Sequence, residues 1–72
     1  PTLYNLGNAY QESGEFQTAI ELYTRAVSQD AKYGEGYFAR GACYDAMEQY
    51  QSALLDYDTA LELMPHMSDL WY

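Results

Sequence analysis

The sequence is poor in basic residues, in cysteine and in long apolar runs, and each shortage excludes a class of function. Three basic residues stand against eleven acidic ones, which gives a net charge of −8. Because a phosphate backbone is bound by clustered cations, the chain is not expected to bind nucleic acid. Its single cysteine allows no intrachain disulfide and is consistent with a reducing compartment such as the cytoplasm. No apolar run approaches the ~20 residues of a membrane span, so no membrane insertion is expected.

What the sequence does contain is one unit written twice. Apolar residues make up 49% of the chain, and nine of its 72 residues are tyrosine. A shift of 34 residues superimposes the sequence on itself, with these identities: Gly7 and Gly41, Tyr10 and Tyr44, Gln17 and Gln51, Ala19 and Ala53, Tyr23 and Tyr57, Ala26 and Ala60. We therefore divide the chain into a first unit at 1–33, a second at 34–67, and the start of a third unit or a capping helix at 68–72.

Each unit contains two helical patterns with a short turn between them. In the first unit the apolar spacing i, i+3, i+4, i+7 begins at Leu3, and a longer pattern begins at Phe16. The turn between them holds Gly14, whereas the second turn, at Glu48, lacks a glycine. The residues expected on the packed faces are Leu3, Leu6, Gly7, Tyr10, Phe16, Ala19, Ile20, Tyr23, Ala26 and Val27, then Tyr37, Gly41, Tyr44, Met47, Tyr50, Ala53, Leu54, Tyr57, Ala60 and Leu61.

The motif residues resemble those of the tetratricopeptide repeat. The first unit has Leu3, Leu6-Gly7, Tyr10, Ala19, Tyr23 and Ala26 at the family's spacing, and the second unit has Tyr37, Arg40-Gly41, Tyr44, Ala53, Tyr57, Ala60 and Pro65. The resemblance covers essentially the whole chain and departs from the pattern at Arg40, Ala31, Leu3 and Tyr37. It implies an all-α fold, a right-handed superhelix of antiparallel helix-turn-helix pairs. It also implies that the first helix of each pair lines a concave surface.

Arg40 stands on a packed helix face, where a lone charge would be costly. It corresponds to Leu6 of the first unit, and Asp56 likewise replaces Leu22. We expect an ion pair between Arg40 and Asp56 in place of an apolar contact. The alternative is that the Arg40 stem packs while its guanidinium reaches solvent.

By the same resemblance, a stripe beside the packed face lines the concave surface and is the candidate peptide site. We call it the groove stripe, and it comprises Tyr4, Asn8, Gln11, Glu12, Glu35, Phe38 and Asp45. Tyr4, Phe38 and Tyr72 are 34 residues apart and would form an aromatic row, with acidic residues at its rim. The expected partner is a protein or peptide segment with apolar anchors and some positive charge. The alternative is that these aromatic rings pack between repeats.

No residue pattern indicates catalysis, a metal site or a cofactor. His66 is the only histidine and lies in an expected turn, and Cys43 is expected to be a small packed residue. Asn8 alone matches the basic and amide residues with which some members of the family bind chaperone carboxylates, so no such clamp is expected. A second hypothesis is self-association, because two repeats are fewer than the about three needed for a stable array. In that case the apolar end Leu70-Trp71-Tyr72 would contact another copy.

Overall fold

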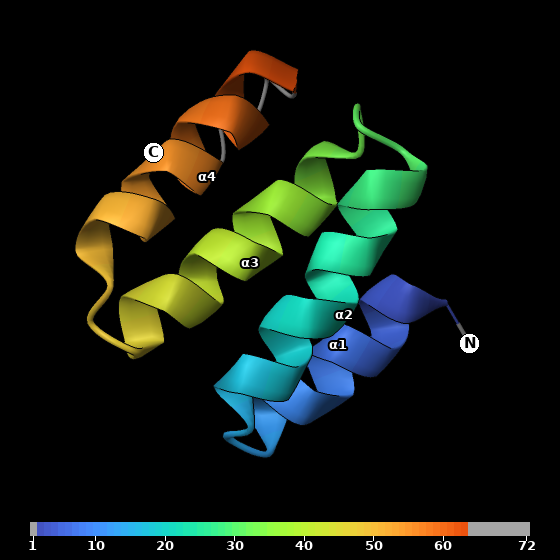
Figure 1. Ribbon diagram of the computed structural model, residues 1–72, viewed down its shortest axis with the longest axis vertical. Helices are drawn as coiled ribbons and strands as arrows, with labels where there is room; N and C mark the ends of the chain where they lie inside the picture. The colour runs from blue at the N-terminus through green and yellow to red at the C-terminus, as the bar shows by residue number, and fades with distance from the viewer. Residues whose placement is uncertain (1, 64–72) are drawn as a thin grey trace, which may run out of the picture.

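The computed structural model describes residues 2–63, and there it consists of four α-helices and no strand. The helices are α1 (Leu3–Glu12), α2 (Phe16–Gln29), α3 (Gly34–Ala46) and α4 (Tyr50–Leu63). Each helix packs against the next one along the chain, and α1 also touches α3. Figure 1 shows the resulting row of alternating helix directions from α1 to α4. The all-α fold expected from the sequence is confirmed, while the expectations for Pro65, His66 and Leu70-Trp71-Tyr72 lie outside the described residues.

Two turns of the same geometry join the helices within each unit. The Glu15 amide donates to the Tyr10 carbonyl at 2.9 Å, and the Gln49 amide donates to the Tyr44 carbonyl at 2.8 Å. This closure places the preceding residue in the left-handed region, where glycine is the usual choice. Gly14 has φ 87°, and Glu48 adopts φ 63° although it carries a side chain. The second turn therefore forms without the glycine that the first turn uses.

The buried core lies mainly between the two units, where α2 is covered from both sides. Its members are Ala19, Ile20 and Tyr23 of α2 with Ala39 and Cys43 of α3. Gly7 of α1 allows the close approach of the Tyr23 ring, because a Cβ there would lie 2.6 Å from a ring carbon. Glycine at position 7 is thus required by the position of the Tyr23 ring in the α1–α2 contact.

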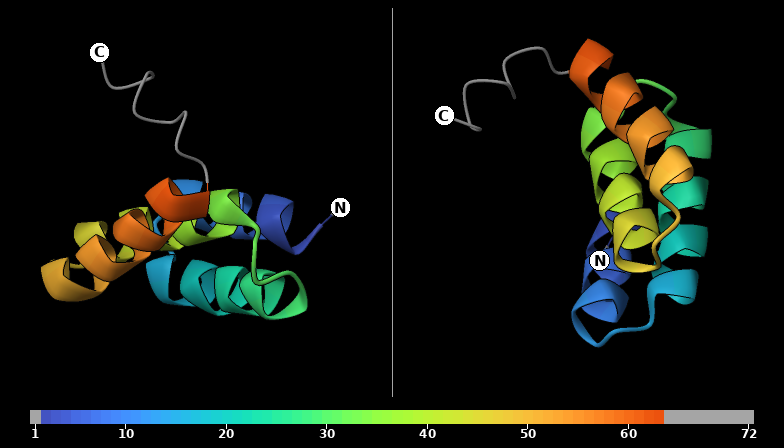
Figure 2. Two further views of the ribbon diagram at one scale, coloured as in Figure 1. Left: turned by 90° about the horizontal axis from the view of Figure 1, so that it is seen from above. Right: turned by 90° about the vertical axis from the view of Figure 1, so that its left-hand side faces the viewer.

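The expectation that both helices of each unit bury a complete apolar face is wrong at the two ends of the row. Tyr50 and Leu54 of α4 are each 60% exposed, and Leu6 and Tyr10 of α1 are also exposed. The physical reason is the number of neighbours: within residues 2–63, α4 contacts only α3. Figure 2 shows α4 at one edge of the helix row, on the far side of α3 from α1.

Candidate functional site

The groove stripe is carried by α1 and α3, two helices that touch each other directly. Its acidic members Glu12, Glu35 and Asp45 are exposed, whereas Tyr4, Asn8, Gln11 and Phe38 are half-buried. An open recess of about 460 Å³ lies at one end of the stripe and is lined by Asn8, Gln11, Glu12 and Phe16. The stripe thus has a polar recess and an acidic rim on one pair of neighbouring helices.

The two amides of the stripe are held by a buried hydroxyl. The Tyr23 hydroxyl lies 2.5 Å from Asn8 Oδ1 and 2.8 Å from Gln11 Oε1. A hydroxyl has only one proton to donate, so both contacts are satisfied when one amide accepts and the other presents its NH₂ to the hydroxyl oxygen. Burial raises the pKa of Tyr23 above its ordinary value, and the nearby ionisable groups of Cys43, Tyr4 and Glu12 raise it further. The hydroxyl therefore stays protonated and orients both amides.

The two aromatic rings of the stripe pack against rings of other helices and turns. Tyr4 has its ring centroid 5.8 Å from that of Tyr23 and 5.4 Å from that of Tyr33, the latter at an edge-to-face angle of 76°. Phe38 lies 5.3 Å from Tyr57. These contacts fix the orientation of both rings, each on its own unit. The third member of the expected row, Tyr72, lies outside the described residues.

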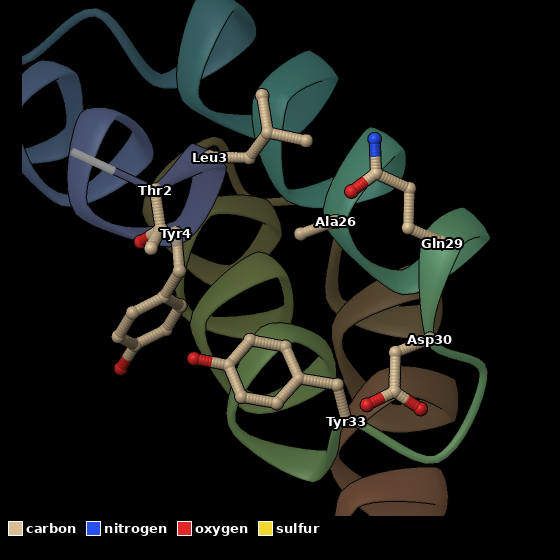
Figure 3. Close-up of a pocket in the computed structure, with 7 residues that line it drawn as sticks. All are labelled: Thr2, Leu3, Tyr4, Ala26, Gln29, Asp30 and Tyr33. Atoms are coloured by element: carbon tan, nitrogen blue, oxygen red, sulfur yellow. The ribbon is translucent and has the colours of Figure 1, made fainter.

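A second cavity opens between the start of α1, the end of α2 and the residue before α3. We call it the Tyr33 pocket; its volume is about 240 Å³, and Figure 3 shows its lining residues: Thr2, Leu3, Tyr4, Ala26, Gln29, Asp30 and Tyr33. Tyr4 is the member it shares with the groove stripe. The sequence analysis did not identify this pocket. Tyr33 lies outside the helical periodicity, and its counterpart 34 residues on is Met67, so no repeat signal marks it.

Arg40 joins three helices. Its Nε and Nη2 donate to the two carboxylate oxygens of Asp56 on α4, both at 2.8 Å, and its Nη1 donates to Thr24 Oγ1 on α2 at 3.2 Å. The guanidinium carbon also lies 5.5 Å from the centre of the Tyr37 ring. The hydrogen bond to Asp56 raises the pKa of Arg40 despite the opposing effect of burial. The arginine is therefore paired, and the contact with Thr24 ties the second unit to the first.

The chemistry available in the described part of the chain is that of a binding surface. Residues 2–63 contain no group of three or more side chains suited to hold a metal ion. Cys43 is fully buried, and burial raises the pKa of its thiol to about 11, which leaves little thiolate at neutral pH. Asp56 is occupied by Arg40, as described above. None of the helices among these residues is long and apolar enough to cross a bilayer.

The comparisons with known proteins agree with the repeat geometry. The family model of the tetratricopeptide repeat matches the chain twice, at residues 1–33 and 34–67. Curated relatives include a UDP-N-acetylglucosamine--peptide N-acetylglucosaminyltransferase of Giardia intestinalis, 36% identical over 86% of this chain and 4% of its own length. Human serine/threonine-protein phosphatase 5 is 35% identical over 90% of this chain and 13% of its own length.

Stress-induced-phosphoprotein 1 of Caenorhabditis elegans is 37% identical over 82% of this chain and 18% of its own length. The chain thus spans less than a fifth of each of these three relatives, whose names describe different activities. What they share with it is the repeat region. With two matched units and the helix-turn-helix geometry that both of them adopt, the chain belongs to the tetratricopeptide repeat family.

Proposed function

We propose that the chain is a non-catalytic interaction module that binds a peptide segment of a partner protein along the groove stripe. Tetratricopeptide repeats are in general non-catalytic protein-interaction modules, and relatives named as enzymes carry their catalytic parts outside the repeat region. The observation that carries the proposal is the open recess of about 460 Å³ lined by Asn8, Gln11 and Glu12. It offers oriented amides beside a carboxylate on the same helices that touch across the two units.

The charge of the stripe selects the partner. Glu12, Glu35 and Asp45 are exposed acidic residues, and none of the three basic side chains of the chain belongs to the stripe. Charge complementarity therefore favours a peptide with positive charge and disfavours an acidic terminus. The half-buried rings of Tyr4 and Phe38 supply apolar area for an anchor residue of that peptide.

A random peptide library displayed on phage and selected on the 72-residue chain tests this proposal. The recovered peptides are then titrated by fluorescence anisotropy against Glu12→Ala and Asp45→Ala, with Glu21→Ala and Glu62→Ala as exposed controls on α2 and α4. We expect the stripe variants to raise Kd about threefold or more and the controls to leave it unchanged. Equal effects in both sets, or a selection that recovers no binder, would contradict the proposal.

A second candidate function, end-to-end stacking with another copy, rests on the exposed apolar face of α4. Leu54 corresponds to Ile20 of the first unit, which is 6% exposed beneath α3, whereas Leu54 itself is 60% exposed. The exposed Leu6 and Tyr10 of α1 offer a complementary apolar end on a second copy. Sedimentation equilibrium distinguishes the two candidates: stacking predicts oligomers that Leu54→Glu dissociates, and a monomer at all concentrations excludes it.

A further inference from the structure

We propose that the Tyr33 pocket binds an arginine side chain of the partner, as a specificity subsite beside the groove stripe. This inference rests on the proposed function, because the arginine would belong to the peptide bound there. Three features of the pocket support it: its size, the aromatic rings at its mouth, and a carboxylate without a cationic partner.

The size of the cavity suits one long side chain. Its volume of about 240 Å³ lies below the roughly 300–1,000 Å³ of typical small-molecule sites. Leu3 and Ala26 give the cavity an apolar side along which the methylene groups of an arginine can pack. Tyr4 belongs to both the pocket and the groove stripe, so a peptide in the groove passes the mouth of the pocket.

The aromatic rings at the mouth are fixed in orientation. Tyr33 meets the ring of Tyr4 edge to face, with centroids 5.4 Å apart. In Figure 3 the Tyr33 hydroxyl points toward the Tyr4 ring, and the Tyr33 ring extends across the mouth of the pocket. A cation within about 6 Å of a tyrosine ring is attracted to the electron-rich face. A guanidinium is planar and weakly hydrated, so it stacks on such a face more readily than an ammonium does.

Asp30 supplies the charge. Its Oδ1 accepts the backbone N–H of Lys32 at 3.1 Å, and this contact fixes the carboxylate at the end of α2. The ion pair of Arg40 with Asp56 is the one that residues 2–63 form, so Asp30 has no cationic partner among them, even though Lys32 lies two residues away. Desolvation raises the pKa of Tyr33, and the negative charges of Glu35 and Asp30 add to that rise. The mouth of the pocket is therefore a region of negative potential.

The test is a titration of the ¹⁵N-labelled chain with N-acetylarginine amide, followed by backbone amide shifts in NMR spectra. N-acetylcitrulline amide is the matched probe, since it has nearly the same shape and no charge. We expect saturable shifts centred on Tyr4, Asp30 and Tyr33 with arginine and at least about threefold weaker binding with citrulline. Equal binding of the two probes, or shifts spread evenly over all acidic surfaces, would overturn the inference.

Variants then separate the pocket from its surroundings. Asp30→Asn removes the charge but keeps an oxygen that can accept the Lys32 N–H, so the turn is retained; we expect it to weaken arginine binding about threefold. Asp58→Asn, at an exposed position on α4, is the matched control and is expected to leave binding unchanged. Tyr33→Phe should retain the binding that Tyr33→Leu loses, because only the ring face is used. Equal effects of Asp30→Asn and Asp58→Asn would refute the assignment.

The outcomes also separate this inference from the proposed function. Peptides that bind the groove stripe and are insensitive to Asp30→Asn would uphold the module and overturn the arginine subsite. Arginine that saturates the pocket while the peptide selection yields no binder would support the subsite and contradict the module.

Discussion

Replacing Arg40 by leucine is expected to damage the fold more than any other single change at the α3–α4 contact. Asp56 is 6% exposed, and both of its carboxylate oxygens accept from Arg40 at 2.8 Å. The variant would leave this carboxylate buried without a partner, at a cost of about 3–5 kcal/mol. For a chain of this length, such a loss lowers Tm by about 12 °C or more.

The reverse change, Asp56→Leu, is expected to cost less. The side chain of Arg40 is 18% exposed, and it keeps its contacts with Thr24 and the Tyr37 ring. The double variant Arg40→Leu with Asp56→Leu reproduces the residue pair Leu6 and Leu22 of the first unit. It should lie within about 1 kcal/mol of the parent, because apolar replacements of buried ion pairs are often neutral.

The measurement is urea unfolding of the four proteins followed by circular dichroism, with sucrose added if the Arg40→Leu variant is unfolded in buffer. The two single variants and the double variant form a thermodynamic cycle. We expect a coupling free energy of at least about 2 kcal/mol. A coupling below about 0.5 kcal/mol would show that the two residues contribute independently, and would refute the reasoning.

Three further predictions concern the turns and the core. Glu48→Gly should raise stability by about 0.5–1 kcal/mol in thermal melts, because Glu48 has a φ of 63° that glycine adopts freely; unchanged or lower stability would contradict a strained turn. Gly7→Ala should destabilise by about 1–3 kcal/mol, since the new Cβ would lie 2.6 Å from the buried Tyr23 ring. A higher Tm would mean that helix propensity outweighs the contact. Burial raises the pKa of Cys43 to about 11 from an ordinary value of 9.0, so its contribution to stability is complete below pH 9 and is lost as the pH rises through about 11; Cys43→Ala should make Tm fall less over that range, and an identical decline in both proteins would refute it.

The sequence predicted those features that depend on periodicity within the chain. The 34-residue shift identified both helix pairs, and the Gly14 turn is where the pattern placed it. Comparing the two copies also led to the pairing of Arg40 with Asp56, which the structure contains. These inferences succeed because each compares one position of the chain with its counterpart in the other repeat.

Features that depend on neighbouring elements could not be predicted in this way. The apolar pattern of Leu54 equals that of Ile20, yet only Ile20 is covered by a following helix. Likewise, Asn8 reads as a free groove residue, and its contact with the Tyr23 hydroxyl depends on the angle between α1 and α2. The Tyr33 pocket arises where three chain segments meet, which no spacing along the sequence encodes.

The position of the Arg40 ion pair also determines how α4 detaches. Among residues 2–63, α4 is held by α3 alone, and its exposed apolar side chains contribute little to that contact. Asp56 lies at the middle of α4, so neither half of the helix can leave without the other unless the carboxylate loses its guanidinium. The helix therefore opens as one cooperative unit, and amide hydrogen exchange along its central turns should report a single opening free energy below that of α2.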